Sequence, residues 1–295
     1  LVGHQAAVSA LATIPGVTDA FITGGKDGKV ILWQIGVDGI KINGGGDLRT
    51  THSNVHTTIS GVVACASGIY SVGFDDKLMA SSIDGSAVNA VLDLESQPVC
   101  IAGTPEGLIV VVTTKLSFFR DGTLLFDAEM ANDVSAIALF NEEEISVVMG
   151  NSVLIFSIDL ASEALVQIGG PLERLGKVTC ISYSPSGEYL AIGDMNRECS
   201  VYSRESWSPK VTSRWVFHTA GITSLAWNPN SKFVATGGLD NAVYVWNVEA
   251  PTQRKKINQA HIGGVTSVKY LDEVMLVSAG NDGFVCLFNT ADLYA

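Results

Sequence analysis

The chain has 295 residues, of which 47% are hydrophobic and 16% are charged, and its formal net charge is −12. This hydrophobic share excludes a disordered chain, and the acidic balance argues against nucleic acid as a partner, because phosphate binding requires a concentrated basic face. The longest apolar runs span about five residues, against the roughly 18 that a membrane helix requires, so we expect no membrane contact.

The cysteines indicate the cellular compartment. Five cysteines occur without a Cys-x-x-Cys pair, which predicts reduced thiols rather than a disulfide framework. The sequence also lacks an Asn-x-Ser/Thr acceptor for glycosylation. We therefore expect a cytoplasmic protein.

Four segments of the chain repeat one strand–turn–strand pattern. In each segment an alternating strand reaches a turn aspartate, a Ser or Thr stands four residues before that aspartate, and a histidine lies further upstream. The residue six positions after the aspartate is tryptophan in the first and third copies, serine in the second and phenylalanine in the fourth. The four sets are His4, Thr23, Asp27 and Trp33; His56, Ser71, Asp75 and Ser81; His218, Thr236, Asp240 and Trp246; and His261, Ser278, Asp282 and Phe288.

These residue types can form a buried chain of hydrogen bonds. An indole N–H donates to the hydroxyl, the hydroxyl to the imidazole and the imidazole to the carboxylate, so each polar group is satisfied within an apolar sheet. Only the sets with Trp33 and Trp246 are complete. A Ser–His–Asp set also suggests nucleophilic catalysis, but that chemistry requires an exposed nucleophile and an oxyanion hole. Because the set recurs four times on buried strands, we predict structural sets, no enzyme, and no cofactor or metal site.

The spacing of the turn aspartates gives the number of repeats. Asp27 and Asp75 lie 48 residues apart, Asp240 and Asp282 lie 42 apart, and the 165 residues between Asp75 and Asp240 leave room for three more repeats. A period of about 40–45 residues with four strands per unit is typical of propeller blades. A β-sandwich, the alternative, has no reason to repeat four residue types at fixed offsets. Weaker strand patterns fill the interval at Val99–Phe119, Val134–Ile158 and Val178–Tyr202.

We therefore predict an all-β fold, a seven-bladed WD-repeat β-propeller with four-stranded antiparallel blades. The three weaker blades are expected to be held by apolar packing and turns alone. Only Leu1 and Val2 precede the first Gly3-His4, so the last blade is expected to have three strands, or a fourth from residues before Leu1. The approximate blades are 1–47, 48–95, 96–130, 131–171, 172–217, 218–259 and 260–295.

The last two repeats resemble a particular family of WD-repeat proteins. The stretch Ser213–Val248, with its Trp-x-Phe-His-Thr sequence, is similar to the penultimate blade of the actin-interacting protein 1 family, and Ser96-Gln97-Pro98 falls where that family has similar residues. The resemblance implies the C-terminal half of a two-propeller protein, monomeric and associated with the cytoskeleton. It also implies binding to actin filaments and cofilin, assistance in filament disassembly, and end capping. The alternative is a generic WD-repeat scaffold or adaptor for another complex.

Two charged segments are candidate surfaces. The stretch Asp121–Glu163 holds nine acidic residues and no Lys or Arg, which predicts a solvated acidic rim or an electrostatic guide for basic partners. Basic residues cluster near the outermost strands of the fifth and sixth blades, where they protect a sheet edge or bind an acidic partner such as actin. We expect charge reversal of the last three to weaken filament binding. The basic residues are Arg204, Lys210, Arg214, Arg254, Lys255 and Lys256.

Overall fold

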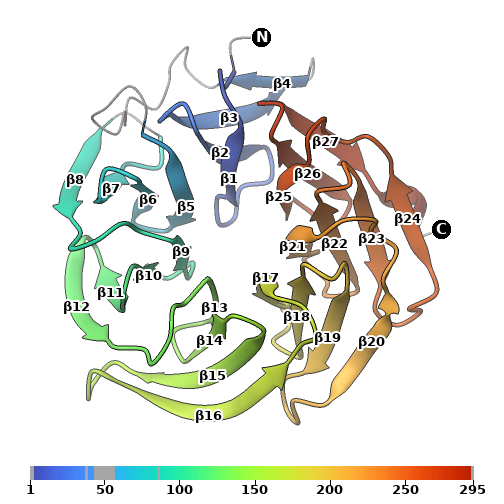
Figure 1. Cartoon of the computed structure of the whole chain (residues 1–295). Coiled ribbons are helices and arrows are strands. Elements are labelled where there is room, and N and C mark those ends of the chain that lie inside the picture. The colour runs from blue at the N-terminus through green and yellow to red at the C-terminus, as the bar shows by residue number, and fades with distance from the viewer. Residues whose placement is uncertain (1–2, 37–38, 43–56, 85–86, 294–295) are drawn as a thin grey trace.

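The computed structural model describes residues 3–36, 39–42, 57–84 and 87–293. It shows seven small antiparallel sheets arranged in a ring, each built from strands that follow one another in the chain (Figure 1). This confirms the prediction of an all-β, seven-bladed propeller. In the described part of the chain, no helix is long and apolar enough to cross a membrane.

The first three blades each have four strands. The first is β1 (Val8–Thr13), β2 (Ala20–Gly25), β3 (Val30–Gly36) and β4 (Gly39–Ile42). The second is β5 (Ile59–Cys65), β6 (Gly68–Gly73), β7 (Lys77–Ser81) and β8 (Val88–Asp93). The third is β9 (Cys100–Gly103), β10 (Leu108–Val112), β11 (Leu116–Arg120) and β12 (Thr123–Ala128).

The remaining blades continue the same order around the ring. The fourth is β13 (Ala136–Phe140), β14 (Glu144–Met149), β15 (Ser152–Asp159) and β16 (Ala164–Glu173). The fifth is β17 (Val178–Tyr183), β18 (Tyr189–Asp194), β19 (Cys199–Ser203) and β20 (Pro209–Trp215). The sixth is β21 (Ile222–Trp227), β22 (Phe233–Gly238), β23 (Val243–Asn247) and β24 (Arg254–Ile257), and the seventh is β25 (Val265–Tyr270), β26 (Met275–Gly280) and β27 (Val285–Asn289), followed by the short 3-10 helix η2 (Ala291–Leu293).

The second strand of a blade is buried on both faces, because a neighbouring blade covers each side. Every residue of β10, with the sequence LIVVV, is buried, as is every residue of β22. The β-branched side chains of such runs suit a pleated, enclosed strand. Small residues set the approach between blades: a Cβ added to Gly24 or Gly237 would come within 2.5 Å of Ile59 or 2.4 Å of Val265 on the next blade. Neighbouring blades could not pack this closely if those glycines were replaced.

The hydrophobic core is divided among the interfaces between blades. Among the residues that the structure describes, buried side chains form seven clusters, one at each interface around the ring. The interface that joins the last blade to the first packs Val277 and Leu271 against Val8 and Phe21. Each such side chain contributes about 1.5–3 kcal/mol when it is fully buried. Side-chain packing therefore closes the ring.

The seventh blade differs from the others at its outer side. Its sheet has three strands in the part of the chain that the structure describes, whereas the other six sheets have four. The side chains of β27 from Val285 to Phe288 are half-buried, while the corresponding strand β23 is buried from Val243 to Trp246. The exposure follows from the missing cover of an outer strand on β27 within the described residues.

Candidate functional site

The His–Asp sets of blades one and six form the expected chain of contacts. In blade six, His218 Nδ1 lies 2.9 Å from Asp240 Oδ1 and its Nε2 lies 2.8 Å from Thr236 Oγ1, to which the Trp246 indole N–H donates at 2.8 Å. Burial lowers the pKa of His218, so the ring is neutral at pH 7. Its Nδ1–H donates to Asp240 and its Nε2 accepts from Thr236.

Blade one repeats this geometry. His4 lies 2.9 Å from Asp27 and 2.7 Å from Thr23, and the Trp33 indole donates to Thr23 at 2.7 Å. Burial alone would raise the pKa of Asp27, but hydrogen bonds from His4 and the Gln5 backbone N–H outweigh it, and the pKa is lowered. The carboxylate therefore joins the connecting segment to the turn between β2 and β3.

The partial sets are described to different extents. In blade seven, His261 lies 2.9 Å from Asp282 and 2.7 Å from Ser278, and Phe288 supplies no indole donor. For blade two, His56 lies outside the described residues, while Ser71 on β6 is buried and Asp75 lies in the turn before β7.

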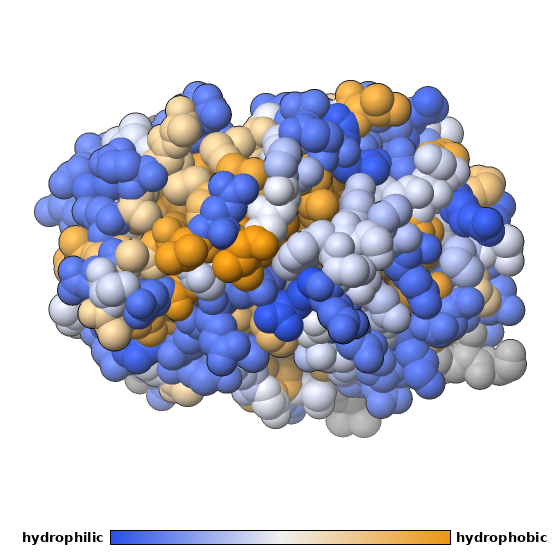
Figure 2. All heavy atoms as spheres, turned by 90° about the horizontal axis from the view of Figure 1, so that it is seen from below, coloured by the Kyte–Doolittle hydropathy of each residue, from blue (hydrophilic) through white to orange (hydrophobic). Residues whose placement is uncertain are grey.

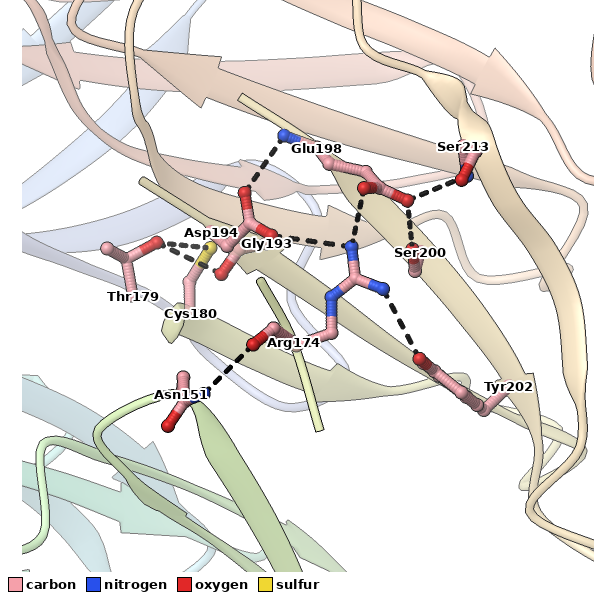
Figure 3. Close-up of polar contacts among 10 residues, drawn as sticks. All are labelled: Asn151, Arg174, Thr179, Cys180, Gly193, Asp194, Glu198, Ser200, Tyr202 and Ser213. Carbon is pink, nitrogen blue, oxygen red and sulfur yellow. Dashed lines mark hydrogen bonds and ion pairs between the residues drawn. The ribbon is translucent and has the colours of Figure 1, made fainter. Parts of the chain in front are cut away.

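Blade five corrects the expectation that the weaker blades are held by apolar packing and turns alone. Arg174 stands four residues before β17, as His218 stands four residues before β21. The strand registers place Tyr202 at the position of Trp246 and Asp194 at that of Gly238. The Arg174 guanidinium lies 2.9 Å from Glu198 and 3.3 Å from Asp194, and it donates to the Tyr202 hydroxyl at 3.3 Å (Figure 3). We call these four residues, Arg174, Asp194, Glu198 and Tyr202, the Arg174 cluster.

The Arg174 cluster is enclosed and its carboxylates are held by further donors. The side chains of Arg174 and Asp194 are 8% and 1% exposed. Glu198 accepts from the Ser213 backbone N–H at 2.7 Å and the Ser200 hydroxyl at 3.0 Å (Figure 3). Burial alone would raise the pKa of Glu198, but the hydrogen bonds from Ser213 and Arg174 lower it. The cluster joins β19 and β20 to the segment that enters the blade.

A second buried ionic contact joins blades four and five. Glu144 on β14 is 4% exposed. It accepts from the Tyr183 hydroxyl at 2.6 Å and from the Arg204 guanidinium at 2.9 Å. The guanidinium also lies 4.1 Å from the centre of the Phe140 ring. Glu144 is thus not part of a solvated acidic rim, and Arg204 is not a free surface cation.

The other predicted basic residues also have partners. Lys210 lies 3.8 Å from Glu249, and Lys255 donates to Asp292 at 2.6 Å. Two further cations stand over aromatic rings, Arg254 at 3.5 Å from the centre of Phe217 and Lys256 at 5.4 Å from that of Tyr244. Arg214 is exposed on β20. The six residues therefore cover the outer strands β20 and β24 and the end of β19, and five of them make contacts within the chain.

The rim at blade four is apolar as well as acidic. Figure 2 views the ring from this side and shows an apolar patch among hydrophilic side chains. The outer strand β16 contributes Val166 and Ile168, which are 55% and 50% exposed, and it contains no Lys or Arg. Asp159 and Glu163, just before this strand, are exposed. The predicted acidic segment thus borders a sheet edge that is apolar at Val166 and Ile168 and lacks basic residues.

Sequence reasoning missed a set of large apolar side chains on one face of the ring. This face is formed by the turns between the second and third strands and by the segments that connect successive blades. We call the set the apolar arc, and its members are 94, 43, 43, 80 and 65% exposed in chain order. They are Leu175, Met195, Leu239, Ile262 and Phe284.

Contacts show that the arc is continuous from blade five to blade six. The Met195 backbone N–H donates to the Lys177 carbonyl at 2.9 Å, and the Leu239 N–H donates to the Gly221 carbonyl at 3.0 Å. A Cβ added to Gly221 would come within 2.8 Å of the Met195 sulfur, and one added to Gly264 would come within 3.2 Å of Leu239. Met195 and Leu239 therefore each lie against a glycine of the next blade.

The arc continues over blade seven toward blade one. Ile262 and Phe284 both donate their backbone N–H groups to Asp282, at 2.9 and 3.1 Å, so the two exposed side chains share one anchor. A Cβ added to Gly283 would come within 3.0 Å of the Ala6 carbonyl of blade one. The arc thus spans three blades and ends beside a fourth.

The charges around the arc favour an acidic partner. Lys26, Lys177 and Arg197 are exposed on the same face. The aspartates there are engaged: burial alone would raise the pKa of Asp240, but hydrogen bonds from the Thr219 N–H and His218 lower it. Exposed apolar patches rimmed by polar groups mark interaction sites. The arc, with exposed cations beside it, is the strongest candidate for a binding face.

Known proteins resemble this chain. The family model for the WD domain, G-beta repeat, matches residues 1–34, 170–203 and 209–247. Actin-interacting protein 1 of Drosophila melanogaster is 30% identical, over 92% of this chain and 44% of that protein. The 66 kDa stress protein of Physarum polycephalum is 32% identical, and actin-interacting protein 1-2 of Arabidopsis thaliana is 30% identical, each over 96% of this chain and 46% of the relative. The chain spans about half the length of these curated relatives.

Proposed function

We propose that this chain is a protein-binding propeller that regulates actin filaments. It contains WD-repeat matches and is similar along nearly its whole length to proteins named for interacting with actin. In this proposal it is a cytoplasmic monomer, forms one half of a two-propeller protein, and assists cofilin in filament disassembly and end capping.

The main support for the proposal is the apolar arc, an exposed surface that suits a protein partner. Protein interfaces are centred on a few apolar anchors, with charges at the rim that set the orientation of the partner. Ile262 and Phe284 are 80% and 65% exposed and adjacent, which suits such an anchor. The neighbouring cations Lys177 and Arg197 suit an acidic partner. The basic side chains of β24 are a second proposed contact.

The burial of the hydroxyl groups in the Ser/Thr–His–Asp sets supports a non-catalytic role. The hydroxyl-bearing residues Thr23, Thr236 and Ser278 are 0% exposed. In blades one and six the hydroxyl also accepts the indole N–H. A nucleophile must reach its substrate, and these hydroxyls are enclosed between blades.

The test is co-sedimentation with actin filaments, bare and decorated with cofilin. The double variant Ile262→Glu/Phe284→Glu places two charges on the arc at exposed positions, so folding is retained. We expect it to weaken binding to decorated filaments about tenfold or more. The matched control is Leu124→Glu on β12, an apolar residue that is 48% exposed on the far rim, and it should bind as the unchanged chain does.

A second variant separates the arc from the basic edge. Charge reversal of Arg254, Lys255 and Lys256 together tests the β24 surface. Loss of binding in this variant alone would assign the contact to the edge of blade six. A chain that fails to sediment with filaments, with or without cofilin, would contradict the proposal and favour a WD-repeat adaptor for another complex.

A further inference from the structure

The inner strands of the blades face the centre of the ring (Figure 1). Their side chains line a central channel of about 560 Å³. Small apolar residues, hydroxyls and thiols line most of it. Among the described residues of its wall, Lys269 on β25 is the one charged side chain, and no Asp or Glu lines it. A cation thus faces the channel without an acidic side chain in the described wall, in a protein whose formal net charge is −12.

Two serine hydroxyls lie beside Lys269. Side chains two apart on a strand point to the same side, and both Ser267 and Lys269 line the channel while Val268 between them does not. The Val268 backbone N–H donates to the Ser224 hydroxyl oxygen at 3.1 Å, which places Ser224 of blade six at the same point. The Ser224 oxygen thereby accepts a hydrogen bond and still has its own hydrogen to donate.

These three groups have unused donor capacity. Within the described parts of the chain, Lys269 makes no ion pair or hydrogen bond, and the hydroxyls of Ser267 and Ser224 donate to no acceptor. Other channel hydroxyls are occupied: Thr223 donates to the Val265 carbonyl at 2.6 Å, and Thr179 to that of Ile222 at 2.6 Å. Lys269, Ser267 and Ser224 thus bring three unused donors together on the wall, where blades six and seven meet.

No charged partner balances the Lys269 ammonium among the described residues of the channel wall. Burial lowers the pKa of the Lys269 ammonium, and the Cys180 thiol is the titratable group whose charge would act on it. Burial raises the pKa of Cys180 to about 12, so this thiol is neutral at pH 7. Burying part of a cation is costly unless an anion pairs with it. A bound anion would relieve that cost.

We propose that Lys269, Ser267 and Ser224 form a binding site for a small oxyanion in the central channel, with inorganic phosphate as its simplest ligand. The anion would accept one charged and two neutral hydrogen bonds, and its charge would balance the ammonium. The site joins two neighbouring blades, so an occupied site also ties blade six to blade seven. It lies on the channel wall, apart from the apolar arc, and does not depend on actin binding.

The experiment is calorimetric titration of the chain with inorganic phosphate at pH 7.5, in chloride buffer of constant ionic strength. We expect saturable binding with one site per chain. Lys269→Met keeps the length of the side chain and removes the charge, and it should weaken phosphate binding at least about tenfold. Lys232→Met, at an exposed lysine outside the channel, is the matched control and should leave the affinity unchanged.

A second measurement does not depend on affinity. Reductive methylation with 13C labels the lysine amines, and the resonance absent from Lys269→Met identifies Lys269. Its pKa should rise when phosphate is added, because an anion stabilises the charged form. Absence of saturable binding, equal affinity in Lys269→Met, or an unchanged Lys269 pKa at saturating phosphate would each overturn the proposal.

Discussion

Thr236 is the centre of the blade-six hydrogen-bond chain, so replacing it with valine is a sharp test of that chain. Valine has nearly the same shape and lacks the hydroxyl. The change leaves the Trp246 indole N–H and the His218 Nε2 without partners, on side chains that are 0% and 1% exposed. Each unsatisfied buried group costs about 1–3 kcal/mol, so Thr236→Val should lower the free energy of unfolding by about 2–6 kcal/mol.

Equilibrium unfolding in urea, followed by far-ultraviolet circular dichroism, measures this loss. The control is Thr252→Val, at an exposed threonine in the turn between β23 and β24, which should change stability by less than about 0.5 kcal/mol. In a Trp246→Phe background the indole donor is already absent. The same Thr236→Val change should therefore cost about 1–3 kcal/mol less there. A loss in Thr236→Val no larger than that of the control would refute the account of the His–Asp sets.

Two further predictions concern the buried charges. Arg174→Met leaves the enclosed carboxylates of Asp194 and Glu198 without their cation and should lower the free energy of unfolding by about 3–5 kcal/mol in the same urea assay. Arg197→Met, at an exposed arginine in the adjacent turn, should lower it little, and equal losses in the two variants would show that the Arg174 cluster contributes nothing specific. Because burial lowers the pKa of His218, the folded state binds fewer protons than the unfolded state, and stability should fall as pH drops below about 6.5; the urea midpoint should decrease between pH 7.5 and 5.5, and His218→Gln should flatten that slope. The aspartates add to the loss only below about pH 4, since their folded pKa values are lowered.

The sequence was sufficient for the blade count because a propeller repeats its contacts locally. Thr236 and Asp240 are four residues apart, and their offsets follow from one strand and one turn. The same spacing at Thr23 and Asp27 therefore identified the repeat. The large separations between blades did not matter, since each blade forms from consecutive strands.

The Arg174 cluster and the apolar arc escaped prediction for different reasons. Arg174 and Tyr202 occupy the repeat positions of His and Trp in blade six. Blade five therefore lacks the residues of the repeat pattern, and its polar cluster was not recognised. The arc brings together residues that are far apart in the sequence. Met195 and Leu239 are 44 residues apart, and each contacts a glycine of the next blade only after the blades have packed. Single apolar residues in turns carry no periodic signal. Glu144 was misassigned to the acidic rim for a related reason, because its partner Arg204 lies 60 residues away.

The Arg174 cluster also bears on how the blades of this ring diverged from one another. In blade six the histidine accepts a hydrogen bond from the Thr236 hydroxyl, which itself accepts the Trp246 indole N–H. In blade five an arginine pairs with two carboxylates. Changing only Arg174 to histidine would leave a negative charge enclosed. Changing only His218 to arginine would leave the Thr236 hydroxyl without its imidazole acceptor. Each single replacement passes through a less stable protein. Conversion of one arrangement into the other therefore requires several residues of the blade to change together.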